Sequence, residues 1–193
     1  MVIYTELPWG DKRTAKFVTN VGLITSDGPN GPNIMAAEWT HQASYSPGMI
    51  AVSIGHEKAT AENIRATKRF GVGIASAKQA VLASVAGNYS GRQYDKIAAS
   101  KALGFHFYRG RKAKVLMVKD AAMNAECRLV KAIRLGDHTM FVGEVLSAFV
   151  SENEPVAYNG GRYMQLGRSA RKPSGKERER IKRIMEKHRK AAA

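Results

Sequence analysis

Residues 33–55 of the chain read NIMAAEWTHQASYSPGMIAVSIG. Residues 34–37 are small or apolar, and we expect them to end one strand. Residues 49–54 are apolar again and, with Gly or Pro on both sides, predict the next strand. The polar linker between them, residues 38–46, holds short hydrogen-bonding side chains and two aromatics. Such a linker can line a flat ligand with polar edges, and an ordinary hairpin with a polar loop is the alternative.

The composition is that of a globular protein with one domain of ordinary size. The chain has 193 residues, of which 44% are hydrophobic and 24% charged. No run approaches the roughly 18 apolar residues of a membrane span, and residues 1–11 lack the pattern of a signal peptide. Cys127 is the only cysteine, so we expect a buried residue in a reducing, cytoplasmic compartment. The five histidines are scattered, without the spacing of metal ligands.

Positive charge is concentrated at the C-terminal end. The net charge is +15, from 31 basic and 16 acidic residues, and residues 168–193 hold 11 of the basic and 3 of the acidic ones. Residues 176–190 predict a charged helix with a single apolar stripe, which docks on a partner subunit or on its own body. A solvated tail that binds polyanions is the alternative. We therefore expect a domain of residues 1–167 followed by a basic linker and helix.

The remaining patterns predict antiparallel strands. Residues 17–26 and 33–39 flank a dense cluster of turn residues and predict a hairpin with a long loop. Residues 122–135 alternate between apolar and polar side chains, which indicates a strand with one solvated face. Gly136-Asp137 predicts a tight turn, and residues 138–150 the returning strand.

Two segments are candidates for binding an anion. Thr60 is expected to cap a helix, with Ile64 and Thr67 facing inward. The free amides at such a helix N-terminus favour an anion, and Lys58 adds a cation. A capped surface helix is the alternative.

The second segment, residues 88–96, presents a hydroxyl, a bare backbone and a guanidinium at Ser90, Gly91 and Arg92. Lys96 follows Arg92 by four residues, so on a helix the two cations share a face. This cluster either binds a phosphate or is a solvated helix start.

Residues 105–118 are irregular and basic, with Phe107 and Tyr108 between the charges. This pattern can mimic a nucleic-acid surface, but we favour a solvated loop over the ligand site. The basic loop of residues 109–114 could also favour an extra phosphate on a ligand. The rest of the chain shows no RNP-like aromatic pattern and no helix-turn-helix, so nucleic-acid binding is the weaker alternative.

These motifs together resemble the flavin reductase-like, FMN-binding split-barrel family. The first match is a small-residue strand, an aromatic, a polar turn with proline and a strand ending in Ser-Ile, all within residues 33–55. The second is Gly136-Asp137-His138 at a hairpin, followed by Phe-Val-Gly-Glu-Val. The segment Thr60 to Ile64, the Ser-Gly and Asp-Lys pairs of residues 90–96, and the closing Pro155 to Tyr163 complete a resemblance that covers about residues 17–166.

The resemblance implies a mainly β protein, an antiparallel Greek-key split β-barrel of about six strands with flanking helices. It also implies a homodimer with FMN as cofactor and NADH or NADPH as co-substrate. The activity implied is NAD(P)H-dependent flavin reduction, with no acid–base residue required and no metal. An FMN-containing electron carrier or ferric reductase is the alternative. Whether FMN is a prosthetic group or a substrate stays open, as does NADH versus NADPH.

The resemblance also implies the residues of the site. His138 would bind the nicotinamide dinucleotide as an orienting or phosphate-binding group; alternatively, it is only a turn residue opposing Asp137. The residues expected to hold FMN are Ala37, Glu38, Trp39, Thr40, Ser53, Ile54, Gly55, Lys58, Thr60, Asn63, Ser90, Gly91, Arg92, Lys96 and Tyr158.

Overall fold

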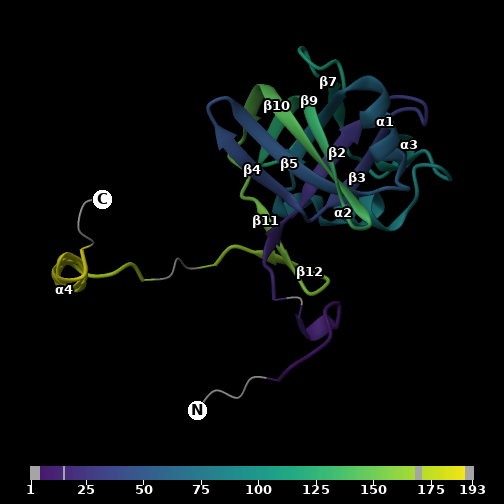
Figure 1. Ribbon diagram of the computed structural model, residues 1–193. Helices are drawn as coiled ribbons and strands as arrows, with labels where there is room; N and C mark the ends of the chain where they lie inside the picture. Colours follow the sequence, from purple (N-terminus) through teal and green to yellow (C-terminus); the bar gives the residue numbers. More distant parts are fainter. Residues whose placement is uncertain (1–4, 15, 168–170, 190–193) are drawn as a thin grey trace.

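The computed structural model of the protein describes residues 5–14, 16–167 and 171–189 (Figure 1). The strands are β1 (Thr19–Asn20), β2 (Gly22–Ser26), β3 (Asn33–Ala37), β4 (Thr40–Tyr45), β5 (Gly48–Gly55), β6 (Arg69–Ile74), β7 (Phe107–Arg109), β8 (Leu116–Val118), β9 (Met123–Leu135), β10 (His138–Val150), β11 (Val156–Asn159) and β12 (Arg162–Gln165). The helices are η1 (Lys12–Thr14), α1 (Ala59–Thr67), η2 (Ala77–Gln79), α2 (Ala80–Asn88), α3 (Lys96–Ala102) and α4 (Gly175–Lys187). None of these helices is long and apolar enough to cross a membrane.

Seven strands form one antiparallel sheet in the order β3-β2-β6-β9-β10-β5-β4. β3 and β4 lie at opposite edges, although only Glu38 and Trp39 separate them in the sequence. In a flat sheet with strands about 4.8 Å apart, the outer strands would be about 29 Å apart. The step from Ala37 to Thr40 reaches at most about 11 Å. The sheet must therefore curl, and Asn20 Nδ2 donates to Thr40 O (2.6 Å) where its two ends meet.

The prediction of a mainly β, antiparallel barrel with flanking helices is confirmed, with seven strands in the main sheet instead of about six. Both predicted hairpins are present. β2 pairs with β3, with Gly22 opposite Ala37, and β9 pairs with β10, with Leu135 opposite His138. Gly136 takes a left-handed φ of 55° in the tight turn between β9 and β10, a conformation that glycine adopts without strain.

The barrel interior is filled by large apolar side chains from several strands and from α1. Phe70, Phe141, Ile24 and Ile64 are fully buried in one cluster, and each stabilises the fold by roughly 1.5–3 kcal/mol relative to an exposed position. The predicted burial of Cys127 is confirmed, and desolvation raises its thiol pKa to about 12. A second cluster lies between the sheet and α2, so α2 covers the outside of the barrel beside β3.

Residues 40–45 form a strand, so the expectation of a polar linker over residues 38–46 was wrong for most of its length. β4 pairs with β5, with Thr40 opposite Val52. The His41 and Gln42 side chains of β4 are exposed. This suits an edge strand, where only one side of the backbone pairs with a neighbouring strand.

The predicted helix after β5 is present, but its start differs. α1 begins at Ala59 with Lys58 as its N-cap, and no side chain caps it. The Thr60 hydroxyl instead accepts a hydrogen bond from Asn33 Nδ2 (2.9 Å), which joins α1 to β3. Ile64 is fully buried as expected, whereas Thr67 is exposed at the end of the helix.

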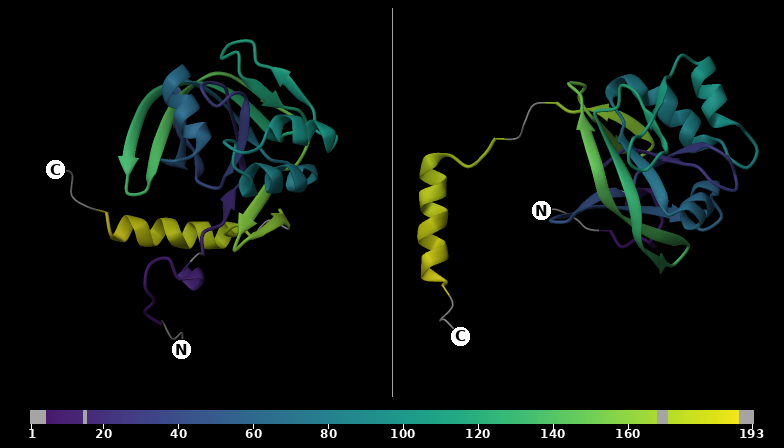
Figure 2. Two further views of the ribbon diagram at one scale, coloured as in Figure 1. Left: turned by 90° about the vertical axis from the view of Figure 1, so that its right-hand side faces the viewer. Right: turned by 90° about the horizontal axis from the view of Figure 1, so that it is seen from above.

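A small sheet of β1, β11 and β12 lies at one end of the barrel (Figures 1 and 2). Val156 of β11 joins the buried cluster under α2. In both figures α4 lies apart from the barrel, and Ile181, Ile184 and Met185 on it are exposed. Residues 168 and 190, where the predicted linker begins and the predicted helix ends, lie outside the described residues.

Candidate functional site

Three cavities adjoin one another around β3. The lysine cavity, about 180 Å³, is lined by Asn33, Met35, Lys58, Ala59, Thr60, Ala86, Gly87, Asn88, Tyr89, Ser90, Gly91 and Lys96. The tryptophan cavity, about 160 Å³, is lined by Met35, Ala36, Ala37, Glu38, Trp39, Ser53, Gly55, Lys58 and His138. The tyrosine cavity, about 220 Å³, is lined by Val21, Ala36, Glu38, Ala83, Gly87, Asn88, Tyr158 and Tyr163. Each pair of cavities shares two lining residues, so the three are direct neighbours around β3.

Lys96 brings an unbalanced positive charge into the lysine cavity. It is the first residue of α3 and only 2% exposed. Its ammonium donates to Ala86 O (3.1 Å) and forms no ion pair with a carboxylate among the described residues. Burial, and then the charge of Lys58, lower the pKa of Lys96 to about 8. A buried ammonium is costly unless an anion accompanies it, so the cavity is built for an anionic group.

The N-terminus of α1 faces the same cavity. Its N-cap, Lys58, offers no side-chain acceptor to the first two amides of the helix, those of Ala59 and Thr60, which have no partner within the helix itself. The third amide, Ala61 N, donates to Lys58 O (2.9 Å). Ser90 and Gly91 also line this cavity, and a Cβ at Gly91 would clash with the Asn33 side chain. Glycine is therefore required for this close approach. The cavity combines the Lys96 ammonium and that of Lys58, which also lies 3.0 Å from Glu57 Oε1, with amides and hydroxyls, the donor set that binds phosphate.

The tryptophan cavity is a slot between the end of β3, β5 and the tip of the β9–β10 hairpin. The register of β10 and β5 sets His138 opposite Gly55. The rings of Trp39 and His138 lie 4.7 Å apart and tilted by 50°. His138 Nδ1 lies 2.8 Å from Asp137 Oδ1, and this hydrogen bond lowers the carboxyl pKa of Asp137. Because Asp137 holds one ring nitrogen, the orientation of the imidazole is restricted.

Most of the residues predicted for the site line these cavities. Thr60, Ser90, Gly91 and Lys96 line the lysine cavity, and Lys58 lines both it and the tryptophan cavity. The tryptophan cavity also holds Ala37, Glu38, Trp39, Ser53, Gly55 and His138. Tyr158 lies apart from them in the tyrosine cavity, which Glu38 also lines. The structure thus gathers the predicted residues around β3.

Four predicted residues line none of the three cavities. Ile54 is 1% exposed in the barrel core, and the Thr40 hydroxyl donates to Ala37 O (3.0 Å). Asn63 is fully buried and donates to Gly31 O (2.9 Å), which holds the loop after β2. Arg92 forms an ion pair with Glu62 (2.9 Å).

The expectation that Arg92 and Lys96 share a helix face was wrong. Arg92 precedes α3 and donates to Glu57 O (3.1 Å), whereas Lys96 begins the helix and points inward. The α3 N-cap, Asp95, accepts a hydrogen bond from Ala98 N (2.9 Å) and fixes this start. The two cations therefore have different partners.

Several residues that were not singled out as binding residues also line the lysine and tyrosine cavities. Those with polar side chains, or with none, are Asn33, Gly87, Asn88 and Tyr89. Asn33 begins the strand quoted first, and its polar side chain in an apolar strand was the available signal. Gly87 and Asn88 look like an ordinary helix end in the sequence, so only the packing of α2 against β3 reveals their place.

Residues 105–118 were expected to form an irregular loop over the ligand site. β7 and β8 pair within this stretch, so it is more regular than expected, and none of its residues, including the basic loop of residues 109–114, lines the three cavities. The buried carboxylate of Glu126 accepts hydrogen bonds from the amides of Arg111 (2.9 Å), Lys112 (2.7 Å) and Ala113 (2.6 Å). Burial alone would raise the pKa of Glu126, but these amides and Ser147 lower it below the usual value.

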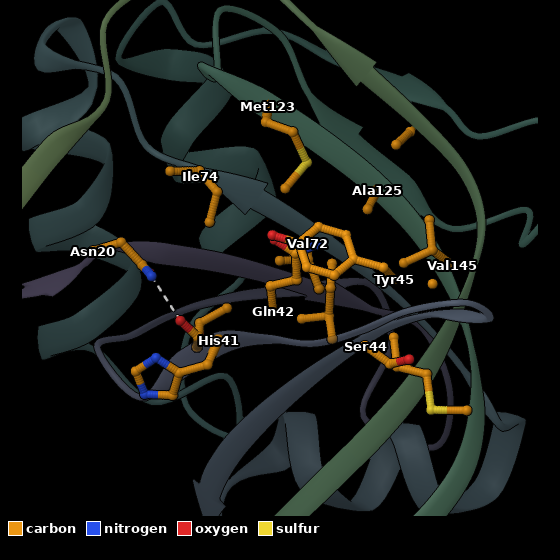
Figure 3. Close-up of a pocket in the computed structure, with 15 residues that line it drawn as sticks. Asn20, His41, Gln42, Ser44, Tyr45, Val72, Ile74, Met123, Ala125 and Val145 are labelled. Atoms are coloured by element: carbon orange, nitrogen blue, oxygen red, sulfur yellow. Dashed lines mark hydrogen bonds between the residues drawn. The ribbon is translucent and has the colours of Figure 1, made fainter. Parts of the chain in front are cut away.

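A larger cavity, about 440 Å³, opens elsewhere in the barrel (Figure 3). Its floor is apolar, with Val72, Ile74, Met123 and Val145. Figure 3 also shows the hydrogen bond from Asn20 to Thr40 at its edge. No lysine or arginine among the residues that the structure describes lines this barrel cavity, so its size does not make it a candidate for a phosphate-bearing ligand.

Comparison with known proteins gives consistent matches. The sequence model of the flavin reductase like domain matches residues 14–167. An uncharacterized protein of Archaeoglobus fulgidus is 36% identical over 124 residues, 64% of this chain and 68% of that protein. FMN reductase (NADH) SmoA of Agrobacterium fabrum is 26% identical over 152 residues, 79% of this chain and 82% of that protein. The fold matches NADH:FAD oxidoreductase SgcE6 of Streptomyces globisporus with a TM-score of 0.77 at 22% identity, covering 88% of this chain and 100% of that one.

Proposed function

The chain belongs to the flavin reductase-like domain family, and from this premise we propose that it binds FMN and transfers hydride to it from NADH or NADPH. The proposal rests on the burial of Lys96, whose ammonium has no paired carboxylate among the described residues. The phosphate of FMN would pair with Lys96 and Lys58 in the lysine cavity. The isoalloxazine ring would lie in the adjoining tryptophan cavity, against Ala36, Ala37 and Gly55. The name of the relative SmoA supports FMN and NADH.

The bound flavin supplies the redox chemistry, and the protein supplies position and electrostatics. Small side chains at Ala36, Ala37 and Gly55 let a planar ring approach the backbone of β3 and β5. Trp39 and His138 lie at the same cavity, where they can limit how a nicotinamide approaches one face of that ring. No general acid or base is needed for hydride transfer, and none is assigned.

Steady-state oxidation of NADH and NADPH tests this function. We expect turnover with free FMN as acceptor, measured by loss of nicotinamide absorbance under anaerobic conditions. The electron-carrier or ferric-reductase alternative predicts comparable rates with ferric chelates and none with free flavin. That result would contradict the flavin reductase proposal.

His138→Ala should raise the KM for NADH about tenfold and change kcat less than about threefold. The reason is that His138 is proposed to orient the dinucleotide without exchanging a proton with it. Its loss should therefore weaken binding of the substrate and of the transition state equally. His106→Ala is the matched control, because His106 is exposed and lines none of the three cavities. An equal loss in kcat and kcat/KM would contradict the proposed role, since it would indicate an interaction made only in the transition state.

FMN affinity should fall as the pH rises above about 8, whereas riboflavin affinity should not. Burial lowers the pKa of Lys96 to about 8 in the free protein. Below that pH the ammonium already carries the charge that the phosphate needs. Above it, FMN binding must take up a proton, so affinity falls by up to about tenfold per pH unit. Fluorescence titrations of both flavins over this range measure the effect, and parallel curves for the two would contradict it.

We infer further that the chain forms a homodimer. The apolar barrel cavity opens to the surface beside Tyr45, which is 89% exposed. Trp9, Phe17 and Val18 are also largely exposed, and such apolar surface supports a contact with a second copy. Light scattering should give about twice the chain mass of 21.1 kDa. A mass of one chain at micromolar concentration would contradict the dimer.

A further inference from the structure

The tip of the β9–β10 hairpin, which carries His138, extends past the end of the neighbouring strand β5. Pairing between β5 and β10 ends with Gly55 opposite His138, and the exposed turn residues Gly136 and Asp137 lie beyond it. His56, the first residue after β5, contacts this turn twice. Its backbone N donates to Asp137 O (3.3 Å), and its ring Nε2 donates to Gly136 O (2.9 Å). His56 therefore joins the turn to the end of β5.

A chain of hydrogen bonds continues from His56 to α1. Arg65 Nη2 donates to Thr139 Oγ1 (2.9 Å), and Thr139 Oγ1 lies 2.9 Å from His56 Nδ1. A guanidinium can only donate, and the Gly136 carbonyl can only accept. In the neutral imidazole of His56, Nε2 therefore carries the proton and Nδ1 accepts from the Thr139 hydroxyl. Each donor along this chain thus meets an acceptor.

The other end of the chain is anchored in the protein interior. Thr139 is only 5% exposed, and the half-buried Arg65 guanidinium lies 5.4 Å from the centre of the Phe141 ring. Phe141 is fully buried in the barrel core. A hydrogen bond from a charged donor is stronger than one from a neutral donor, and a buried hydroxyl without a partner is unfavourable. The exposed turn is therefore connected to α1 and to the core through side chains.

These side chains can affect a ligand at the site only through the hairpin tip. Arg65, Thr139 and His56 line none of the three cavities. Thr139 directly follows His138, whose ring lies 4.7 Å from that of Trp39 in the tryptophan cavity. A side chain that orients a substrate must be held within about 0.5 Å of its productive position. A turn released from α1 and β5 gains freedom of movement, and the His138 imidazole moves with it.

We propose that Arg65, Thr139 and His56 form a positioning network that holds His138 against Trp39 for the nicotinamide dinucleotide. The network touches neither flavin nor dinucleotide and acts through His138. This inference rests on the proposed function and deepens it, because it names the residues that place the dinucleotide-binding group. It also joins that group to α1, the helix whose N-terminus faces the proposed phosphate site.

The kinetic test uses Thr139→Val, which removes the hydroxyl and keeps the shape of the side chain. It should raise the KM for NADH about fivefold, the effect of about one hydrogen bond, with FMN affinity within about twofold of wild type. Thr139→Ser, which keeps the hydroxyl, is the matched control and should restore the KM. In a His138→Ala background, Thr139→Val should change the KM by less than about twofold, because the network acts only through His138. Additive effects of the two substitutions, or an equal loss of FMN affinity, would overturn the inference.

NMR of the histidine rings provides a second measurement, made on the full chain without flavin. The ring signals of His138, identified by their loss in His138→Ala, should be displaced in wild type by the ring current of Trp39. Thr139→Val and Trp39→Leu should both move these signals toward those of free histidine, and Thr139→Ser should not. Signals that stay unmoved in Thr139→Val would overturn the inference, since His56 would then only close the turn. The proposed function would survive that result, because it fails only if wild-type FMN binding or NADH oxidation is absent.

Discussion

Replacing Lys96 with methionine should weaken FMN binding about a hundredfold, because removing one partner of a buried charge pair typically costs about 2–5 kcal/mol. Riboflavin, which has no phosphate, should bind the variant within about twofold of wild type. The reason lies in the burial of Lys96, which is 2% exposed and whose only described hydrogen bond is to Ala86 O. Fluorescence titration with both flavins measures the difference directly.

The same variant should be at least as stable as wild type in the absence of flavin. Methionine fills the volume of lysine without an uncompensated buried charge, and such replacements are often neutral or stabilising. Lys101→Met is the matched control, since Lys101 lies on the same helix but is exposed. If Lys96→Met lost riboflavin and FMN affinity equally, Lys96 would support the fold or the ring and would not bind phosphate.

Glu126→Ala should lower the free energy of unfolding by about 3–5 kcal/mol. The Glu126 carboxylate accepts from three successive backbone amides and from Ser147 Oγ (3.1 Å). Alanine would leave these donors, of which Ala113 N is buried, without partners and would leave a cavity between β9 and the basic loop. Urea unfolding followed by circular dichroism measures the loss. Glu152→Ala on the exposed surface should cost less than about 0.5 kcal/mol.

Glu126 also predicts a loss of stability in acid. Its pKa is lower in the folded protein than the ordinary value of 4.5. Its stabilising contribution is therefore complete above about pH 4.5 and is lost as the pH falls through the lower, folded-state pKa. In the Glu126→Ala variant this part of the acid dependence should disappear. If the Glu126→Ala variant had the same free energy of unfolding as wild type at neutral pH, the Glu126 carboxylate would not hold the basic loop.

Local patterns in the sequence were sufficient for much of the sheet. The alternation of residues 122–135, followed by Gly136-Asp137, is a strong signal because the pleat of a strand has a period of two. The small residues at Ala36 and Ala37 were likewise correctly placed at the end of β3. β4 was missed because its polar side chains resemble a loop, and an edge strand exposes them in the same way.

The environment of Lys96 could not be read from the sequence. Spacing of four residues from Arg92 predicts a shared, solvated face only if both lie on one helix. The helix starts at Lys96, and the carbonyl of Ala86 and the N-terminus of α1 surround it from distant parts of the chain. Burial of this kind depends on contacts between elements, which no local pattern encodes. The resemblance to the family identified Lys96 as a candidate, and only the packing shows that its ammonium is buried.

The position of β3 at the edge of the curled sheet has a consequence for motions of the barrel. β3 is an edge strand, and among the described strands it pairs with β2 alone, so its outer amides open more readily than those of the long β9–β10 hairpin. A ligand that contacts β3, β5 and the start of α1 together would oppose this opening, because it binds only the closed arrangement. Amide hydrogen exchange on FMN addition should therefore slow most in residues 33–40 and least in residues 123–135. A bound flavin would thus hold the curled sheet closed as well as occupy its surface.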